Sequence, residues 1–303
     1  MGSLIATTKS GYEDVYTNLG RALALLNVSA LDTHLPVVIK INMCDARAAE
    51  TGAITHPLFL DAVLHHLRAN SENLKIFVVE SDATVALADK FIQWFGFVPI
   101  LQKWNAEFLN LSKMKAVNKE VKGRYFEEIG VPEILAQPHF FITIPKPKIN
   151  PISTITCCLK NQFGCLPTVD KGVYHPRLDD VIADVNSVIP PDLCLVDGIT
   201  AQGSIWGPAL GVPIPLKAII CSKDPVAVDS YCAKIMGFNP WFIGHIRKSA
   251  SSKVGSMKYT LTGDKIAKVD FETSKLQLRL LKFAGSLRRR TQQQFRAEGR
   301  RRG

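Results

Sequence analysis

The sequence of 303 residues has no apolar run of the roughly 18 residues that a membrane-spanning helix requires. Its first residues, MGSLIATTKSGYED, also lack the long apolar segment of a secretory signal peptide. These absences predict a cytoplasmic protein, since the first residues do not form an export signal. Hydrophobic residues make up 47% of the chain and charged residues 21%, so the chain has enough apolar surface to fold and is not predominantly disordered.

The seven cysteines include no pair with the CxxC spacing of zinc ribbons and ferredoxin-type clusters. Their odd number and their positions in apolar segments indicate reduced thiols in a cytosolic compartment. We therefore expect no iron–sulfur cluster ligands in this chain and assign no residue as a metal ligand, and the sequence leaves open whether a metal is bound. The motifs GxGxxG and GxxxxGK[ST] are also missing, which argues against a dinucleotide or ATP bound in those ways and leaves the cofactor open.

The formal net charge of +10 comes almost entirely from the end of the chain. Residues 275–303 carry ten basic residues and one acidic residue, whereas residues 1–274 carry 27 and 26. Apolar residues of this tail fall at helical spacing, namely Leu276, Leu280, Phe283, Ala284 and Leu287. The pattern predicts a basic amphipathic helix that binds an anionic membrane surface, a partner protein or nucleic acid. A solvated, disordered tail is the alternative.

Short apolar runs alternate with helical patterns along residues 1–274, which form one predicted domain. The expected strands are 37–41, 75–79, 140–144, 193–196 and 218–221. The expected helices are 57–67, 84–95, 179–188 and 225–236. This alternation predicts an α/β fold with a mostly parallel sheet and helices on both faces. Residues 98–138 are less regular and are interpreted as a lobe, a lid or an insertion.

Polar residues follow the first two expected strands, at the strand ends where open α/β sheets bind ligands. Lys40 and Asn42 close the first run, and an unpaired lysine there is costly to bury, which favours a functional role over a solvated edge. Thr55 precedes Pro57 and is expected to cap a helix. Glu80 and Asp82 follow the second run, where the two carboxylates would transfer a proton, bind a metal or pair with Lys40. The alternative is that Asp82 or Ser81 only caps a helix.

The segment 145–164 interleaves lysines, hydroxyls and asparagines without a single acid, which is typical of a carboxylate or phosphate site. Its candidate residues are Lys148, Asn150, Thr156, Lys160, Asn161 and Gly164. If 153–162 is one helix, Thr156 and Lys160 share a face. Cys157 and Cys158 beside them are interpreted as thiols of lowered pKa or as small core residues. His175, further along, is a catalytic candidate.

Two later segments add acids and glycines. Asp197 and Gly198 follow an expected strand, and Gly207 and Gly211 allow close approach of the backbone to a ligand, unless they form only a turn and a long loop. Ser222 lies before Asp224 and Pro225, which are expected to open a helix. Asp229 follows one turn later on an otherwise apolar face, where a carboxylate indicates a function.

These segments occur in the order IKIN, THP, VVESD, PKPKIN, CLKNQFG, VDGI, GPALG, SKDPVAVD and MGFNP. In this order the chain resembles, over residues 36–262, the family catalogued as domain of unknown function 362. Some members of that family are fused to iron–sulfur ferredoxin modules, which this chain lacks, so a redox role implied by the resemblance would need a separate partner protein. Family members commonly have a histidine where Asn150 stands, so no general-base role carries over to that position.

The sequence thus predicts an enzyme that binds a small anionic substrate in a lysine-rich crevice, with redox or proton-transfer chemistry of the oxidoreductase or isomerase kind. The expected catalytic residues are Lys40, Asp82, Lys160, His175, Asp197 and Asp229. The expected substrate-binding residues are Asn42, Thr55, Lys148, Asn150, Thr156, Asn161, Gly164, Gly198, Gly207, Gly211 and Ser222. The alternatives are a non-catalytic module that binds a ligand or cofactor, and a protein tethered to a membrane or partner by its tail.

Overall fold

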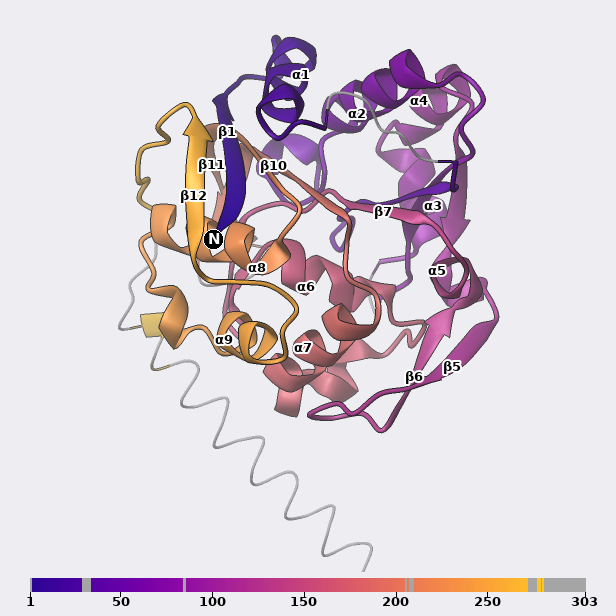
Figure 1. Cartoon of the computed structure of the whole chain (residues 1–303), viewed down its shortest axis with the longest axis vertical. Coiled ribbons are helices and arrows are strands. Elements are labelled where there is room, and N and C mark those ends of the chain that lie inside the picture. The colour runs from indigo at the N-terminus through magenta and orange to yellow at the C-terminus, as the bar shows by residue number, and fades with distance from the viewer. Residues whose placement is uncertain are drawn as a thin grey trace, which may run out of the picture.

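A central sheet lies between two layers of helices in the computed structural model, which describes residues 2–28, 34–83, 86–204, 206, 210–271, 277–278 and 280 (Figure 1). The main path of the sheet contains β1 (Ser3–Lys9), β2 (Val37–Lys40), β3 (Ile76–Glu80), β4 (Glu107–Asn110), β7 (Phe140–Thr143), β10 (Leu193–Gly203), β11 (Val212–Ser222) and β12 (Tyr259–Gly263). Their order is β12-β1-β11-β10-β7-β2-β3-β4. Only the pairs β1–β11 and β10–β11 on this path are antiparallel, which confirms the mostly parallel sheet.

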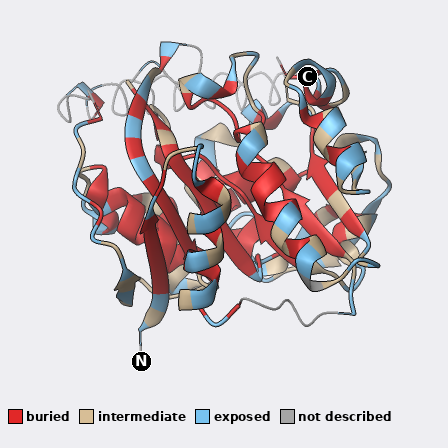
Figure 2. Cartoon of the chain, turned by 90° about the horizontal axis from the view of Figure 1, so that it is seen from above, coloured by how far each residue is buried: buried red, intermediate tan, exposed pale blue. Residues whose placement is uncertain are grey.

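Alternating side chains of each strand enter two separate apolar clusters, one on each face of the sheet. Val37 and Ile39 pack with the first layer of helices, and Val38 between them packs with the second. The first layer contains α1 (Val15–Leu25), α2 (Pro57–Asn70), α3 (Ala88–Trp94) and α4 (Phe97–Lys103). The second contains α6 (Cys158–Gln162), α7 (Leu178–Val188), α8 (Pro225–Ile235) and α9 (Gly244–Ser251). Figure 2 shows the buried strands in the middle and the exposed outer faces of the helices.

The N-terminal caps of two helices can be compared with the caps that the sequence predicts. Asp224 caps α8 by accepting hydrogen bonds from the backbone N–H groups of Val226 and Ala227, as predicted. The cap of α2 is His56 and not Thr55, because the His56 ring nitrogen accepts from the Leu58 N–H.

One strand was not predicted, and one conditional expectation about local structure is wrong. The N-terminal segment forms β1, which the sequence did not suggest. Residues 153–162 are not one helix, because β8 (Lys148–Asn150) and β9 (Thr154–Thr156) form a hairpin before α6 begins. The Asn150 side chain closes this hairpin by accepting from the Ile152 and Ser153 N–H groups. Thr156 and Lys160 therefore lie on a strand and a helix, respectively.

Residues 98–138 divide between the main sheet and a separate hairpin. This segment contains α4 from residue 98 onward and the whole of β4, which belong to the main body. The strands β5 (Ala116–Glu120) and β6 (Glu128–Pro132) pair only with each other and lead into α5 (Glu133–Ala136). The connection between β5 and β6 is tied to α7, since the Asp184 carboxylate accepts from three consecutive backbone N–H groups, those of residues 124–126.

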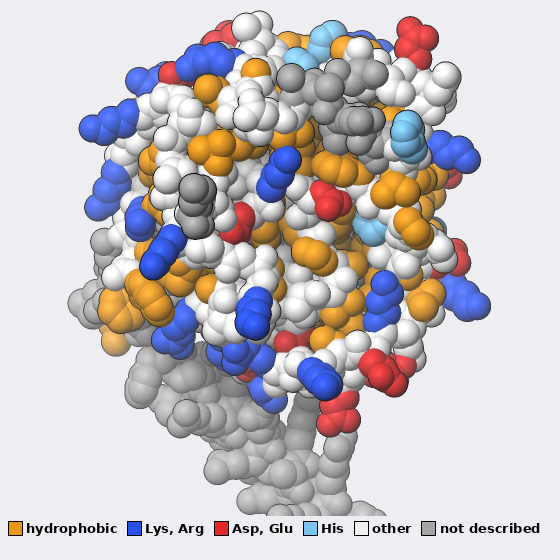
Figure 3. All heavy atoms as spheres, viewed as in Figure 1, with side chains coloured by type: hydrophobic (Ala, Val, Ile, Leu, Met, Phe, Trp, Pro, Cys, Tyr) orange, Lys and Arg blue, Asp and Glu red, His pale blue; other side chains and the backbone are white. Residues whose placement is uncertain are grey.

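Acidic and basic side chains are interspersed over the face of the molecule in Figure 3, as expected for a body of nearly balanced charge. The amphipathic helix predicted for residues 275–303 lies outside the described residues, apart from 277–278 and 280. In the part of the chain that the structure describes, no helix combines the length and apolar character needed to cross a membrane.

A fully buried ion pair joins the centre of the sheet to the first layer of helices. Lys146, which follows β7, lies 3.0 Å from Asp197 of β10, and both side chains are 0% exposed. The Asp197 carboxylate also accepts from the Tyr12 hydroxyl and from the His56 N–H at the start of α2. Burial lowers the pKa of Lys146, so its charge depends on this carboxylate. Asp197 thus connects three separate segments of the chain.

Replacing Asp197 with alanine should therefore lower the free energy of unfolding by about 3–5 kcal/mol, because Lys146 would be left buried without its counter-charge. Urea unfolding followed by circular dichroism measures the loss. The control is Glu107→Ala, which removes an exposed acid from β4 of the same sheet and should change stability by less than about 0.5 kcal/mol. Equal effects of the two variants would contradict a structural role for Asp197.

Candidate functional site

A cavity of about 460 Å³ lies at the carboxyl ends of β2 and β3, next to the β8–β9 hairpin and α6. Because the parallel strands end at one edge of the sheet, residues far apart in the sequence meet here. The cavity brings together these predicted residues: Lys40, Asn42, Lys148, Asn150, Thr156, Lys160, Asn161, Gly164 and His175. Its wall also contains Glu80, Ser81 and Lys171, which the prediction did not select.

The floor of the cavity is a buried ion pair between Lys40 and Glu80. The Lys40 ammonium lies 2.5 Å from the Glu80 carboxylate, and both side chains are at most 5% exposed. The same carboxylate accepts from the backbone N–H groups of Met43 and Ser81. Glu80 thus orders the chain beyond both strand ends and neutralises Lys40. The position of Lys40 confirms that this lysine is not on a solvated edge.

Two asparagines form a fixed amide network above this pair. The Asn161 amide nitrogen donates to the Lys40 carbonyl and to the Thr143 hydroxyl, so the Asn161 oxygen faces the other way. That oxygen accepts from the Asn42 amide nitrogen at 3.1 Å. The Asn42 side-chain oxygen is left buried and has no hydrogen-bond partner among the described residues. A buried acceptor of this kind is costly unless a ligand or water satisfies it.

Lys148 and Lys160 place two further ammonium groups at the cavity. Lys148 is buried and donates to the Ala53 carbonyl and the Cys44 thiol. Lys160, which α6 presents to the cavity, makes no hydrogen bond or ion pair within the part of the chain that the structure describes. Burial lowers the pKa of Lys160 to about 8, and the nearby Lys148 contributes to this shift.

Lys171 closes the cavity from the segment before α7. Its ammonium donates to the Ser81 hydroxyl and to the backbone carbonyl of Asp82. Burial lowers the pKa of Lys171 to about 8, although the Glu80 carboxylate opposes the shift. The sequence around Lys171 is an ordinary polar loop, so only its tertiary position could have identified it. Glu80, in contrast, is the last residue of the apolar strand β3 and could have been chosen over Asp82.

Gly164 and Asn150 line the cavity for steric and structural reasons. A Cβ atom at Gly164 would lie 3.0 Å from the Lys40 ammonium nitrogen, so a side chain there would disturb the buried pair. The Asn150 oxygen is occupied by the turn of the hairpin and by the Ser153 hydroxyl. Asn150 therefore shapes the wall of the cavity.

The other predicted residues do not line the cavity. Asp82 accepts from the Ala88 N–H at the start of α3, and Thr55 links the Asn42 N–H to the Ile144 carbonyl. Ser222 donates to the Leu4 carbonyl. Gly198 and Gly211 have a backbone carbonyl and a glutamine side chain, respectively, where a Cβ atom would point. Gly207 lies outside the described residues.

Asp229 lies beneath the cavity and contacts the start of α6, where its carboxylate accepts from the Cys158 and Leu159 N–H groups. Since α6 carries Lys160 and Asn161, Asp229 positions cavity residues without lining the cavity itself. Cys157 and Cys158 are 0% exposed and belong to the apolar cluster, in agreement with their interpretation as small core residues.

Comparisons with known proteins agree with the motif order. A family model described as "Domain of unknown function (DUF362)" matches residues 37–234. A thylakoid-associated protein of Synechocystis sp. is 26% identical over 153 residues, which cover 48% of this chain and 46% of that protein. The chain thus spans about half the length of this curated relative.

Among solved structures, the lactate racemase apoprotein from Thermoanaerobacterium thermosaccharolyticum superposes with a TM-score of 0.44 and 10% identity, covering 77% of this chain and 57% of that one. The family model, in contrast, matches well over half of the chain and contains every cavity residue named above. The protein therefore belongs to the DUF362 family, a family of unknown function.

Proposed function

We propose that this protein is an enzyme that binds a small carboxylate or phosphate bearing a hydroxyl group in the lysine-lined cavity. The enzyme would remove a carbon-bound proton from this compound and return one to it. The observation that carries the proposal is the Lys160 ammonium, which faces the cavity without a hydrogen bond or ion pair to any described residue. A charged donor in such a position is satisfied by an anion.

The charges around the cavity support an anionic ligand. Four lysines line it, and Glu80, its one acidic residue among those described, is already paired with Lys40. Lys148 and Lys171 donate to neutral groups, and neither forms an ion pair with a described residue. An anion would therefore be attracted by three ammonium groups in a partly desolvated space, where electrostatic interactions are strong.

The asparagine network supports a hydroxyl on the same ligand. The Asn42 oxygen is an acceptor without a partner, and the Asn161 hydrogen bonds fix its orientation. A ligand hydroxyl would satisfy this oxygen while its carboxylate or phosphate contacts Lys160. Small hydroxy acids and hydroxy phosphates carry both groups within a few ångströms.

Proton transfer is the chemistry that these side chains can perform. His175 lines the cavity, and imidazole exchanges protons readily near neutral pH. Lys160 would hold the anion and stabilise negative charge that develops on it. Lys40, held by Glu80, would keep the strand ends in place and would not react.

The proposal is tested by incubating the protein in D2O with glycolate and other small hydroxy carboxylates and phosphates. Mass spectrometry should show solvent deuterium in the carbon-bound hydrogens of a compound that is processed, and Lys160→Met and His175→Gln should abolish the exchange. Acetate, which lacks the hydroxyl, should exchange more slowly than glycolate. Binding without exchange for every compound would instead support a non-catalytic ligand-binding module.

Lys160→Met should weaken glycolate binding by about 10- to 100-fold, because it removes one charge-assisted hydrogen bond worth roughly 1.5–3 kcal/mol. Isothermal titration calorimetry measures the affinity. Lys223→Met is the matched control, because Lys223 is exposed in the loop before α8 and is absent from the cavity wall. Unchanged affinity in Lys160→Met would contradict the assignment of the anion to this ammonium.

The affinity for glycolate should fall by about tenfold or more between pH 7 and pH 9, because a lysine with a pKa of about 8 passes from mostly charged to mostly neutral over this interval. Lys160 and Lys171 both have a pKa of about 8, so the attraction of both ammonium groups for an anion is lost as the pH rises. Glycolate itself stays ionised throughout. Lys171→Arg keeps its charge and should show a smaller fall; identical pH profiles would exclude Lys171 as the cause.

A further inference from the structure

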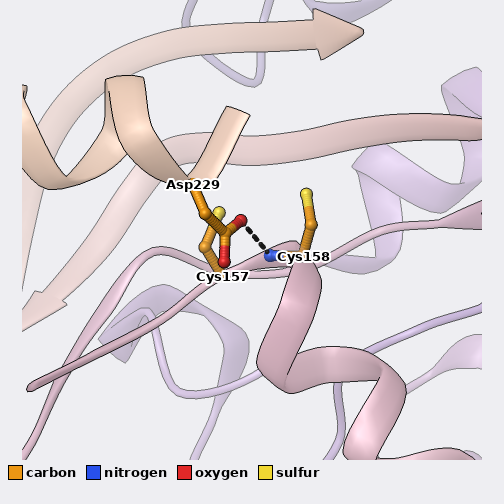
Figure 4. A group of neighbouring side chains, drawn as sticks. All are labelled: Cys157, Cys158 and Asp229. Carbon is orange, nitrogen blue, oxygen red and sulfur yellow. Dashed lines mark hydrogen bonds between the residues drawn. The ribbon is translucent and has the colours of Figure 1, made fainter. Parts of the chain in front are cut away.

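Below the cavity, on the second face of the sheet, thiols and a carboxylate converge where the chain enters α6. Cys157 and Cys158 precede or begin this helix, and Asp229 approaches them from α8 (Figure 4). One sulfur from each cysteine and one Asp229 oxygen all lie within 4.8 Å of one another. The three side chains are 0% exposed, and none of them lines the cavity.

The Asp229 carboxylate has no cationic partner of the usual kind. Its oxygens accept two backbone hydrogen bonds, and no lysine or arginine among the described residues forms an ion pair with it. Burial raises the pKa of Asp229 well above its ordinary value. The carboxylate is therefore buried without a lysine or arginine among the described residues beside it.

The imidazole of His245 provides an independent observation. His245, on α9, is 0% exposed, and neither of its ring nitrogens has a hydrogen-bond partner among the described residues. Its Nε2 atom lies 4.0 Å from the Asp229 Oδ2 atom. The other nitrogen, Nδ1, is 3.6 Å from an Asp179 oxygen, too far for a hydrogen bond. A buried imidazole without a partner is rare, because it forgoes hydrogen bonds that water would provide.

Two buried hydroxyls on the same two helices, α8 and α9, also have no hydrogen-bond partner among the described residues. Ser249 lies one helical turn after His245 on α9, and Ser230 follows Asp229 on α8. Both helices contact each other. The interface of α8 and α9 therefore contains several polar atoms that the described protein groups do not satisfy, next to a pair of thiols and a carboxylate.

We propose that Cys157, Cys158 and Asp229 form a buried site for a thiophilic divalent cation, with Zn²⁺ as the expected occupant. The imidazole of His245, unpartnered among the described residues and 4.0 Å from Asp229, would move toward the cation as the fourth ligand. Sulfur, nitrogen and carboxylate oxygen are the ligands of structural zinc sites, whose tetrahedral geometry places ligand atoms roughly 3.3–3.8 Å apart. The two sulfurs and the Asp229 oxygen, which lie within 4.8 Å of one another, would have to approach by up to about 1–1.5 Å to reach this geometry. Binding would release the thiol protons and supply the positive charge that Asp229 lacks.

Such a cation would cross-link α6, α8 and α9. Because α6 carries Lys160 and Asn161, the cation would also fix the helix that presents them to the cavity. This role is structural: all described ligand atoms are buried, and the site is separate from the cavity in which we place the substrate.

Metal content tests the proposal directly. Protein produced in zinc-supplemented medium and purified without chelators should contain about one zinc ion per chain by mass spectrometry of the acid digest. Asp229→Asn and Cys157→Ala should lose most of this zinc. Cys221→Ala is the matched control, because Cys221 is an equally buried thiol in the apolar cluster on the opposite face, and it should retain the zinc.

A second measurement on the wild type alone guards against variants that fail to fold. Refolding without oxygen in the presence of Co²⁺ should produce a thiolate-to-cobalt charge-transfer band and tetrahedral d–d bands, and zinc X-ray absorption should show two sulfur ligands at about 2.3 Å. Absence of zinc together with absence of the cobalt bands would overturn the proposal. Retention of zinc in Asp229→Asn and Cys157→Ala at the level of the Cys221→Ala control would overturn it as well.

Discussion

The buried ion pair between Lys40 and Glu80 is the interaction on which the cavity depends. It places opposite charges at the ends of two adjacent parallel strands, and the Glu80 oxygens also hold the backbone beyond each strand. Desolvation makes either charge alone costly in this position, so each requires the other. The close approach of Gly164 to this pair explains why a residue without a side chain stands there. The remaining lysines can stay available for a ligand because Lys40 already neutralises the acid.

Much of the fold follows from local sequence. Apolar runs mark the central strands, and Asp224 followed by Pro225 marks the start of α8, because these signals act within a few residues. The β1 strand and the β8–β9 hairpin escaped prediction for a physical reason. β1 is stabilised by partners more than 200 residues away, and the hairpin depends on the Asn150 side chain closing a turn inside an apparently helical pattern. Neither signal is visible in a short window of sequence.

The candidate site shows a similar division. Lysines and asparagines that follow strands could be identified, since the carboxyl ends of parallel strands converge. The acids could not be assigned, because the role of a carboxylate depends on the groups it meets in three dimensions. Asp197 forms an ion pair with a buried lysine, Asp82 accepts a hydrogen bond from the first N–H group of α3, and Asp229 accepts one at the start of α6. Of the two carboxylates that could pair with Lys40, the partner is Glu80, which was not among the catalytic candidates.

The position of β1 in the sheet has a consequence for the order in which the molecule can assemble. The strand lies between β11 and β12, so both of its neighbours come from residues 212–263. A ribosome makes β1 before either of its partners, and domains fold as the chain emerges. The strand β1 therefore has no strand partner until residues 212–263 have been synthesised. Closure of this edge of the sheet is a late event, during which β1 is exposed to chaperones and to other nascent chains.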